Sequence, residues 1–106
     1  MDEVKLANDC LQLARLDLGL ENDFMIEGSN QPFQWLEKIL EERIKIMLDE
    51  DFRGLINAFY RIDIAENTIQ KILELAPPDE VALELARAVI VREKKKVITR
   101  ERYRQS

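Results

Sequence analysis

The side chains that most often carry catalysis or bind metals are nearly absent from this 106-residue chain. Histidine does not occur, and cysteine occurs once, at Cys10. A histidine general base, a zinc site, an iron–sulfur cluster and an internal disulfide are therefore excluded or lack their usual ligands. The three glycines, Gly19, Gly28 and Gly54, are isolated, so no glycine-rich phosphate loop is present. We expect no enzyme activity, no cofactor and no bound metal.

The acids and the lone thiol offer the remaining chemistry. Asp49, Glu50 and Asp51 are consecutive, but the Ca²⁺-loop pattern D-x-[DN]-x-[DN]-G is absent. Acids before a helix or in its first turn are favoured by the helix dipole, so we interpret these three as a helix start. Cys10 lies among apolar residues, which favours a small buried side chain over a reactive thiol.

Charge is distributed unevenly along the chain. The net charge is −5, but residues 1–91 carry −10 and residues 92–106 carry +5. An acidic body repels nucleic-acid backbones and anionic lipid headgroups, so any such binding must be confined to residues 92–106 and must weaken with salt. We treat residues 92–106 as a basic helical extension.

One ridge of this extension is the best functional candidate. Arg92, Lys96 and Arg100 recur every four residues, and Tyr103 follows them on the same side of a helix. Cations near a helix C-terminus gain dipole energy and keep an exposed end soluble, which explains the ridge without a function. The functional alternatives are docking onto the acidic surface of a second copy, contact with an acidic partner, and phosphate binding.

Hydrophobic periodicity predicts the elements that position these side chains. It indicates an all-α fold, a single domain over residues 1–106 made of a compact bundle of about five helices with a long C-terminal helix. We expect helices over about 2–18, 31–49, 52–62, 63–76 and 78–104. Residues 19–31 are expected to form a loop with Phe24, Met25 and Ile26 tucked beneath it, and Ser29 or Asn30 to cap the next helix.

The helix over 31–49 has more apolar surface than one buried side needs. Its apolar arc covers about 220° of the helical wheel, against about 100° for a helix buried on one side. Trp35, Ile39 and Ile46 belong to this arc. The helix is therefore either central in the monomer or covered by a second copy.

Two charges fall on apolar arcs. Arg43 lies near the middle of the arc just described, and Glu93 lies at the centre of the apolar face of the last helix. Arg43 either extends along apolar surface to water or forms an ion pair. We consider a pairing of Arg43 with Glu93 as a hypothesis.

The C-terminal half also carries short motifs at fixed places. They are Asp51-Phe52, Leu55-Ile56, Tyr60-Arg61-Ile62-Asp63, Val89-Ile90, Arg92, Lys96-Val97, Thr99-Arg100 and Tyr103. On these motifs, about fifty residues resemble a family of small, uncharacterised all-helical bacterial proteins without assigned activity. The resemblance implies a helical fold and supplies no catalytic residues. A helix-to-helix corner with an N-cap at Asp63 explains the motif that ends there equally well.

These observations favour a non-catalytic protein–protein interaction module, with self-association as one form of that interaction. The candidate interaction residues are Trp35, Ile39, Arg43, Ile46, Arg92, Lys96, Arg100 and Tyr103. The alternative is an auxiliary nucleic-acid-binding protein that uses Arg92, Lys94, Lys95, Lys96, Arg100, Arg102 and Arg104. No apolar stretch is long enough to cross a membrane and the first residues do not form a signal peptide, so we expect a cytoplasmic protein.

Overall fold

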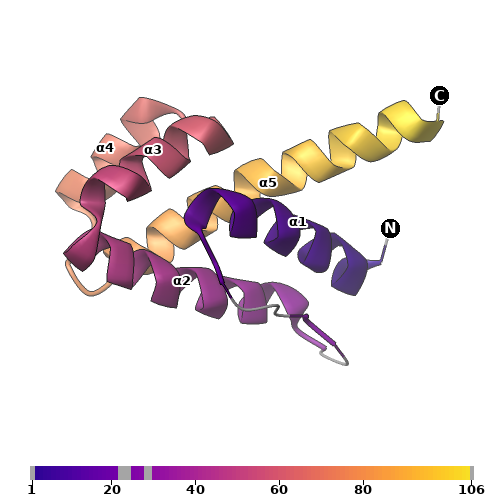
Figure 1. Cartoon of the computed structure of the whole chain (residues 1–106), viewed down its shortest axis with the longest axis horizontal. Coiled ribbons are helices and arrows are strands. Elements are labelled where there is room, and N and C mark those ends of the chain that lie inside the picture. Colours follow the sequence, from indigo (N-terminus) through magenta and orange to yellow (C-terminus); the bar gives the residue numbers. More distant parts are fainter. Residues whose placement is uncertain (1, 22–24, 28–29, 106) are drawn as a thin grey trace.

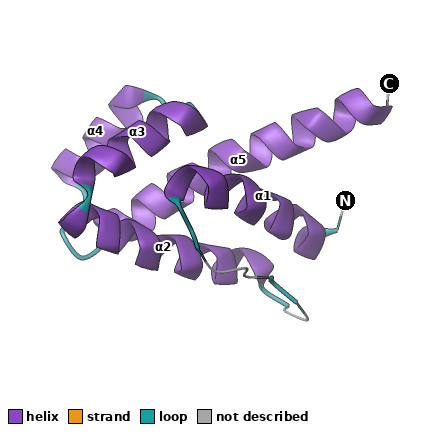
Figure 2. Cartoon of the chain, viewed as in Figure 1, coloured by secondary structure: helices purple, strands orange, loops and turns teal. Residues whose placement is uncertain are grey.

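The computed structural model describes residues 2–21, 25–27 and 30–105. Over these residues the chain forms five helices and no strand, as Figures 1 and 2 show. The helices are α1 (Glu3–Leu18), α2 (Pro32–Glu50), α3 (Phe52–Ile62), α4 (Glu66–Leu75) and α5 (Val81–Gln105). The predicted all-α fold with a long C-terminal helix is confirmed.

Local chemistry explains where α1 begins and ends. The Asp2 carboxylate accepts hydrogen bonds from the backbone N–H groups of Val4 and Lys5, which satisfies donors that the first turn leaves free. Gly19 follows Leu18 with φ +66°, and its N–H donates to the Arg15 carbonyl. A left-handed residue at this position is the usual end of a helix, and glycine adopts it without steric cost.

The corner between α3 and α4 differs from its prediction. Asp63, expected to cap the start of the fourth helix, instead ends α3 in the left-handed conformation with φ +69°. Its N–H donates to the carbonyls of Phe59 and Tyr60. Aspartate is frequent both at helix starts and, among non-glycine residues, in left-handed positions, so its type alone did not decide between the two.

The loop before α2 and the first turn of α2 agree with their predictions only in part. Pro32 lies in the first turn of α2 as expected, but the residue that precedes α2 is Gln31, which forms no side-chain cap. Asn30 therefore does not cap α2, and Ser29, like Phe24, lies outside the described residues. Ile26 is buried as expected, whereas Met25 is exposed.

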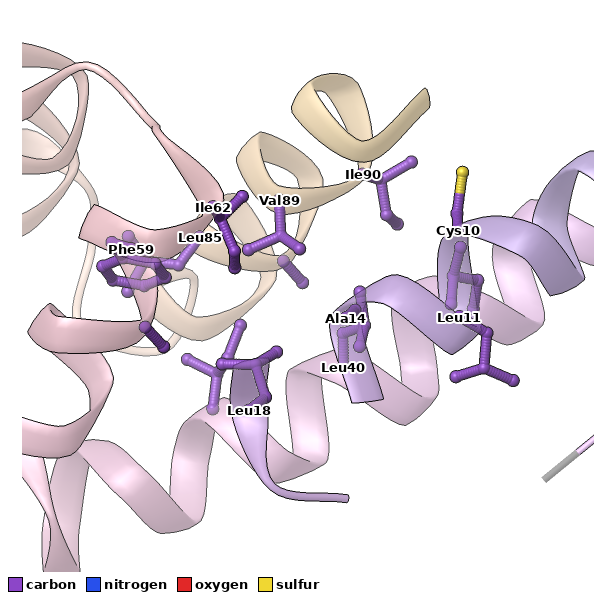
Figure 3. Packing of buried hydrophobic residues seen from close by; sticks show 14 of the residues in the cluster. Cys10, Leu11, Ala14, Leu18, Leu40, Phe59, Ile62, Leu85, Val89 and Ile90 are labelled. Carbon is purple, nitrogen blue, oxygen red and sulfur yellow. The ribbon is translucent and has the colours of Figure 1, made fainter. Parts of the chain in front are cut away.

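The last helix is central to the packing. In Figure 1, α5 runs along the length of the molecule, and it contacts each of the other four helices. Figure 3 shows Leu85 and Val89 of α5 in the core together with Ile62 of α3 and Leu18 of α1. The core is continuous with residues of the predicted basic extension, because Val97 is also buried.

The width of the α2 apolar arc has a clear outcome. Leu36, Leu40 and Ile44 are fully buried on the side that packs against α1, α3 and α5. On the other side, Trp35 is 55% exposed and Ile46 is 49% exposed. The bundle therefore covers only part of the arc, and a second apolar strip is left on the surface.

Candidate functional site

Three residues of the surplus apolar arc, Trp35, Ile39 and Ile46, form one continuous strip on α2 together with Glu42. We call these four residues the α2 surface. Their spacing of four, three and four residues places them along a single line on the helix over about 16 Å. Ile39 is half-buried, and Glu42 is exposed between the apolar members. The strip is thus mainly apolar with one carboxylate near its centre.

A hollow lies on each side of the α2 surface. One, of about 620 Å³, is lined by residues that include Gln31, Gln34, Lys38 and Leu83. The other has a volume of about 310 Å³, and Leu20 and Arg43 are among its lining residues. A ridge between two hollows is the shape that interlocks with the ridges and grooves of another helix.

The charges around this strip differ in whether they are already paired. Glu37 pairs with Arg87 of α5 at 3.4 Å, and Glu41 pairs with Lys45 at 3.7 Å. Lys38 and Glu42 form no ion pair with any described residue. One cation and one acid therefore flank the apolar residues with their charges available.

Arg43 does not pair with Glu93, so that hypothesis is wrong. Its Nε donates to the Leu18 carbonyl at 2.7 Å, and one of its terminal nitrogens lies beside Gly19. A cation at the last carbonyls of a helix is favoured by the dipole. Arg43 therefore fastens α2 to the C-terminal end of α1, next to the α2 surface.

Glu93 is the one buried charged residue among those described, with 1% of its surface exposed. Its partner is Lys96, whose Nζ lies 3.2 Å from Oε1. This contact is an ion pair, and neither carboxylate oxygen has a hydrogen-bond partner of good geometry among the described residues. The pair has the three-residue spacing that brings two side chains together on one face of a helix.

Burial raises the pKa of the Glu93 carboxyl above its ordinary value, and the nearby Asp17 carboxylate adds to the rise. The cations Lys96 and Arg92 oppose it. Burial also raises the pKa of the neighbouring Cys10 thiol to about 11, with the charge of Glu93 as a further cause. Cys10 is 1% exposed and is held as a thiol, which makes it a poor nucleophile.

A second candidate surface, the α5 groove, lies on the C-terminal part of α5 beside α1. It has a volume of about 410 Å³. Its lining residues are Leu13 of α1 and Arg92, Lys95, Lys96, Thr99, Arg100 and Tyr103 of α5. The structure thus brings all four predicted ridge residues into one depression and adds Lys95, Thr99 and Leu13, which spacing alone did not identify.

Lys94 does not belong to this groove. Its Nζ lies 4.4 Å from the centroid of the Phe33 ring, where it forms a cation–π contact between α5 and α2. The nucleic-acid alternative counted Lys94 among its contacts, and the structure has this ammonium against the Phe33 ring rather than among the residues that line the groove.

A third hollow lies between α3 and α4. It has a volume of about 200 Å³, and Ile56, Phe59, Tyr60, Ile69 and Leu73 contribute most of its lining. The hollow carries no charged lining residue except Glu66, so it offers no acid–base pair.

No group of three or more cysteine, aspartate or glutamate side chains close enough to hold a metal ion occurs in the described part of the chain. Among the same residues, no helix has both the length and the apolar character needed to cross a membrane.

Comparisons with known proteins found no matching family model, no matching curated protein and no matching solved structure. The resemblance of the C-terminal half to small helical bacterial proteins therefore stays a prediction.

Proposed function

We propose that this protein is a non-catalytic, cytoplasmic interaction module whose α2 surface binds a second copy of the same chain. The observation that carries the proposal is the half-exposed pair Trp35 and Ile46 on one line of α2. Removing apolar surface from water is the main favourable term in protein association. Tryptophan is also among the residues that most often dominate binding energy at interfaces.

A two-fold axis supplies a specific arrangement. If two copies of α2 pack antiparallel about an axis between Ile39 and Glu42, Trp35 of each copy lies against Ile46 of the other. The same axis brings Lys38 of one copy beside Glu42 of the other. Both charges lack an ion-pair partner among the described residues, so this arrangement matches opposite charges as well as apolar side chains.

The cytoplasmic part of the proposal rests on Cys10. It is a free, buried thiol, and unpaired cysteines are typical of reducing compartments.

Replacing both anchors with glutamine tests the proposal. Sedimentation velocity over a range of protein concentrations should give a dimer for the original chain and a monomer for Trp35→Gln with Ile46→Gln. The loss follows because the two anchors supply most of the apolar surface that the second copy covers. Both side chains are already half in water, so the variant should fold normally.

The matched control is Tyr60→Gln with Leu75→Gln. It removes one aromatic and one aliphatic side chain that are 65% and 78% exposed on α3 and α4. This control should remain dimeric. A monomeric original chain at every concentration, or equal dissociation of the control, would show that the α2 surface is not the interface.

A further inference from the structure

The residues that line the α5 groove take no part in the proposed self-association, which uses the α2 surface. Four of these seven residues are cations, and none is an acid. The acids nearest to it are already engaged, since Asp63 pairs with Arg92 at 3.1 Å and Glu93 lies buried beside Lys96. The groove is therefore a positive depression on a protein whose net charge is negative.

Two of the four cations are unpaired within the part of the chain that the structure describes. Lys95 and Arg100 form no ion pair with any described residue. Arg92 also lines the groove, although its terminal nitrogen already binds Asp63. The groove thus holds cationic groups that an anion could bind.

The cations are arranged in a row. Arg92, Lys96 and Arg100 follow one another at four-residue steps, which corresponds to about 6 Å per step along the helix. A row of evenly spaced charges suits an extended chain of anions better than a single phosphate or carboxylate.

An aromatic side chain stands at the end of the row. Tyr103 lines the groove and is 78% exposed. A positive groove that follows the backbone, combined with an aromatic ring on which a base stacks, is the recurring design of proteins that bind single-stranded nucleic acid. Thr99, which lies between the cations, adds a hydroxyl that can donate to a phosphate oxygen.

We infer that the α5 groove binds a short segment of single-stranded nucleic acid, with its phosphates along Arg92, Lys96 and Arg100, a further phosphate contact from Lys95, and a base stacked on Tyr103. An acidic peptide would satisfy the cations but does not by itself supply a flat base that stacks on the exposed Tyr103 ring. The site is independent of the α2 surface, so either inference can fail without the other.

Fluorescence anisotropy with a labelled twelve-nucleotide oligothymidylate at low salt is the direct test. We expect binding that weakens with salt. For each phosphate contact, the logarithm of the binding constant should fall by roughly 0.7 per ten-fold increase in salt concentration. Lys95→Glu with Arg100→Glu should weaken binding at least about ten-fold and should reduce the salt slope by roughly 1.4, the share of two contacts.

The matched control is Arg53→Glu with Lys71→Glu, which makes the same change of net charge at two exposed cations of α3 and α4. It should bind like the original chain. If the reversal variant loses helical circular dichroism, Lys95→Gln with Arg100→Gln takes its place. Equal loss in the control and in the groove variant would mean that overall charge, rather than the groove, controls binding.

Substitutions of Tyr103 separate bases from other anions. Tyr103→Leu should weaken oligothymidylate binding by about five-fold or more, whereas Tyr103→Phe, which keeps the ring, should retain it. Inorganic polyphosphate and polyglutamate serve as competitors and should displace the oligonucleotide poorly. Absence of binding at low salt, efficient competition by polyglutamate, or insensitivity to Tyr103→Leu would each overturn the assignment.

Discussion

Glu93→Leu should raise the free energy of unfolding by about 1 to 4 kcal/mol at neutral pH, because well-packed apolar residues often replace buried charges at a gain of that size. Glu93 is fully buried and its carboxylate oxygens have no hydrogen-bond partner among the described residues. Lys96 is not stranded by the change, since 29% of its side chain is already exposed. Its ammonium can turn to water when the carboxylate is removed.

The gain should depend on pH in a defined direction. Because burial raises the pKa of Glu93, the folded protein holds its proton at pH values where the unfolded chain has released it. Folding is therefore favoured by this group below its ordinary pKa of 4.5, and that contribution is lost as pH rises through the higher folded pKa. The advantage of Glu93→Leu should be smallest near pH 4 and should grow toward neutrality.

Urea unfolding of both chains across this pH range, at one fixed protein concentration, measures the difference. Glu93→Gln is the control for shape, because it keeps the size of the side chain and removes the charge. Glu93→Gln should remove the contribution of this carboxyl to the pH dependence of the free energy of unfolding. Its gain in that free energy at neutral pH should be smaller than the gain from leucine. A pH-independent difference between Glu93→Leu and the original chain would mean that Glu93 is not buried as a charge.

Leu85→Ala should lower the free energy of unfolding by about 2 to 5 kcal/mol, the range for truncating a fully buried leucine. Leu85 is 0% exposed on α5, the helix that contacts all four others. The cavity should lower the urea midpoint without changing the slope. Ile98→Ala on the same helix is the control, and it should cost less than about 1 kcal/mol because Ile98 is 38% exposed. Equal losses would contradict the position of α5 in the core.

Sequence periodicity predicted the helices well because burial repeats with the helical turn. Gly19 and the apolar run before it identified the end of α1, since a glycine after such a run has few other uses. Asp63 was harder, because its type suits both ends of a helix. In the structure Asp63 ends α3 in the left-handed conformation, and its carboxylate pairs with Arg92 of α5. No local sequence pattern contains that distant contact.

Only part of the candidate surfaces could be predicted, because helical periodicity shows which residues share a face but not what covers that face. The wheel identified Trp35 and Ile46 as surplus apolar residues, but only packing decides which part of a wide arc is covered. It also identified Arg43 and Glu93 as misplaced charges. The partner of Arg43 depends on which helix end lies beside it, whereas the partner of Glu93 is Lys96 on the same helix. Lys94, which the nucleic-acid alternative counted among its contacts, lies over Phe33, about sixty residues earlier in the chain, and no local pattern contains this contact.

Cysteine cross-linking tests the antiparallel α2 pairing most directly. One chain would carry Trp35→Cys and another Ile46→Cys, each with Cys10→Ala, and the two would be mixed and oxidised mildly. In the antiparallel pair the two new thiols face each other, while the mixed dimer keeps one original Trp35–Ile46 contact at its other end. Residues 35 of both copies would lie about 16 Å apart along the helices, beyond the reach of a disulfide.

We predict a disulfide-linked dimer in the mixture and none in either variant alone. A linked dimer that forms equally well from the Trp35→Cys chain by itself, or no linked dimer in the mixture, would contradict the antiparallel α2 interface.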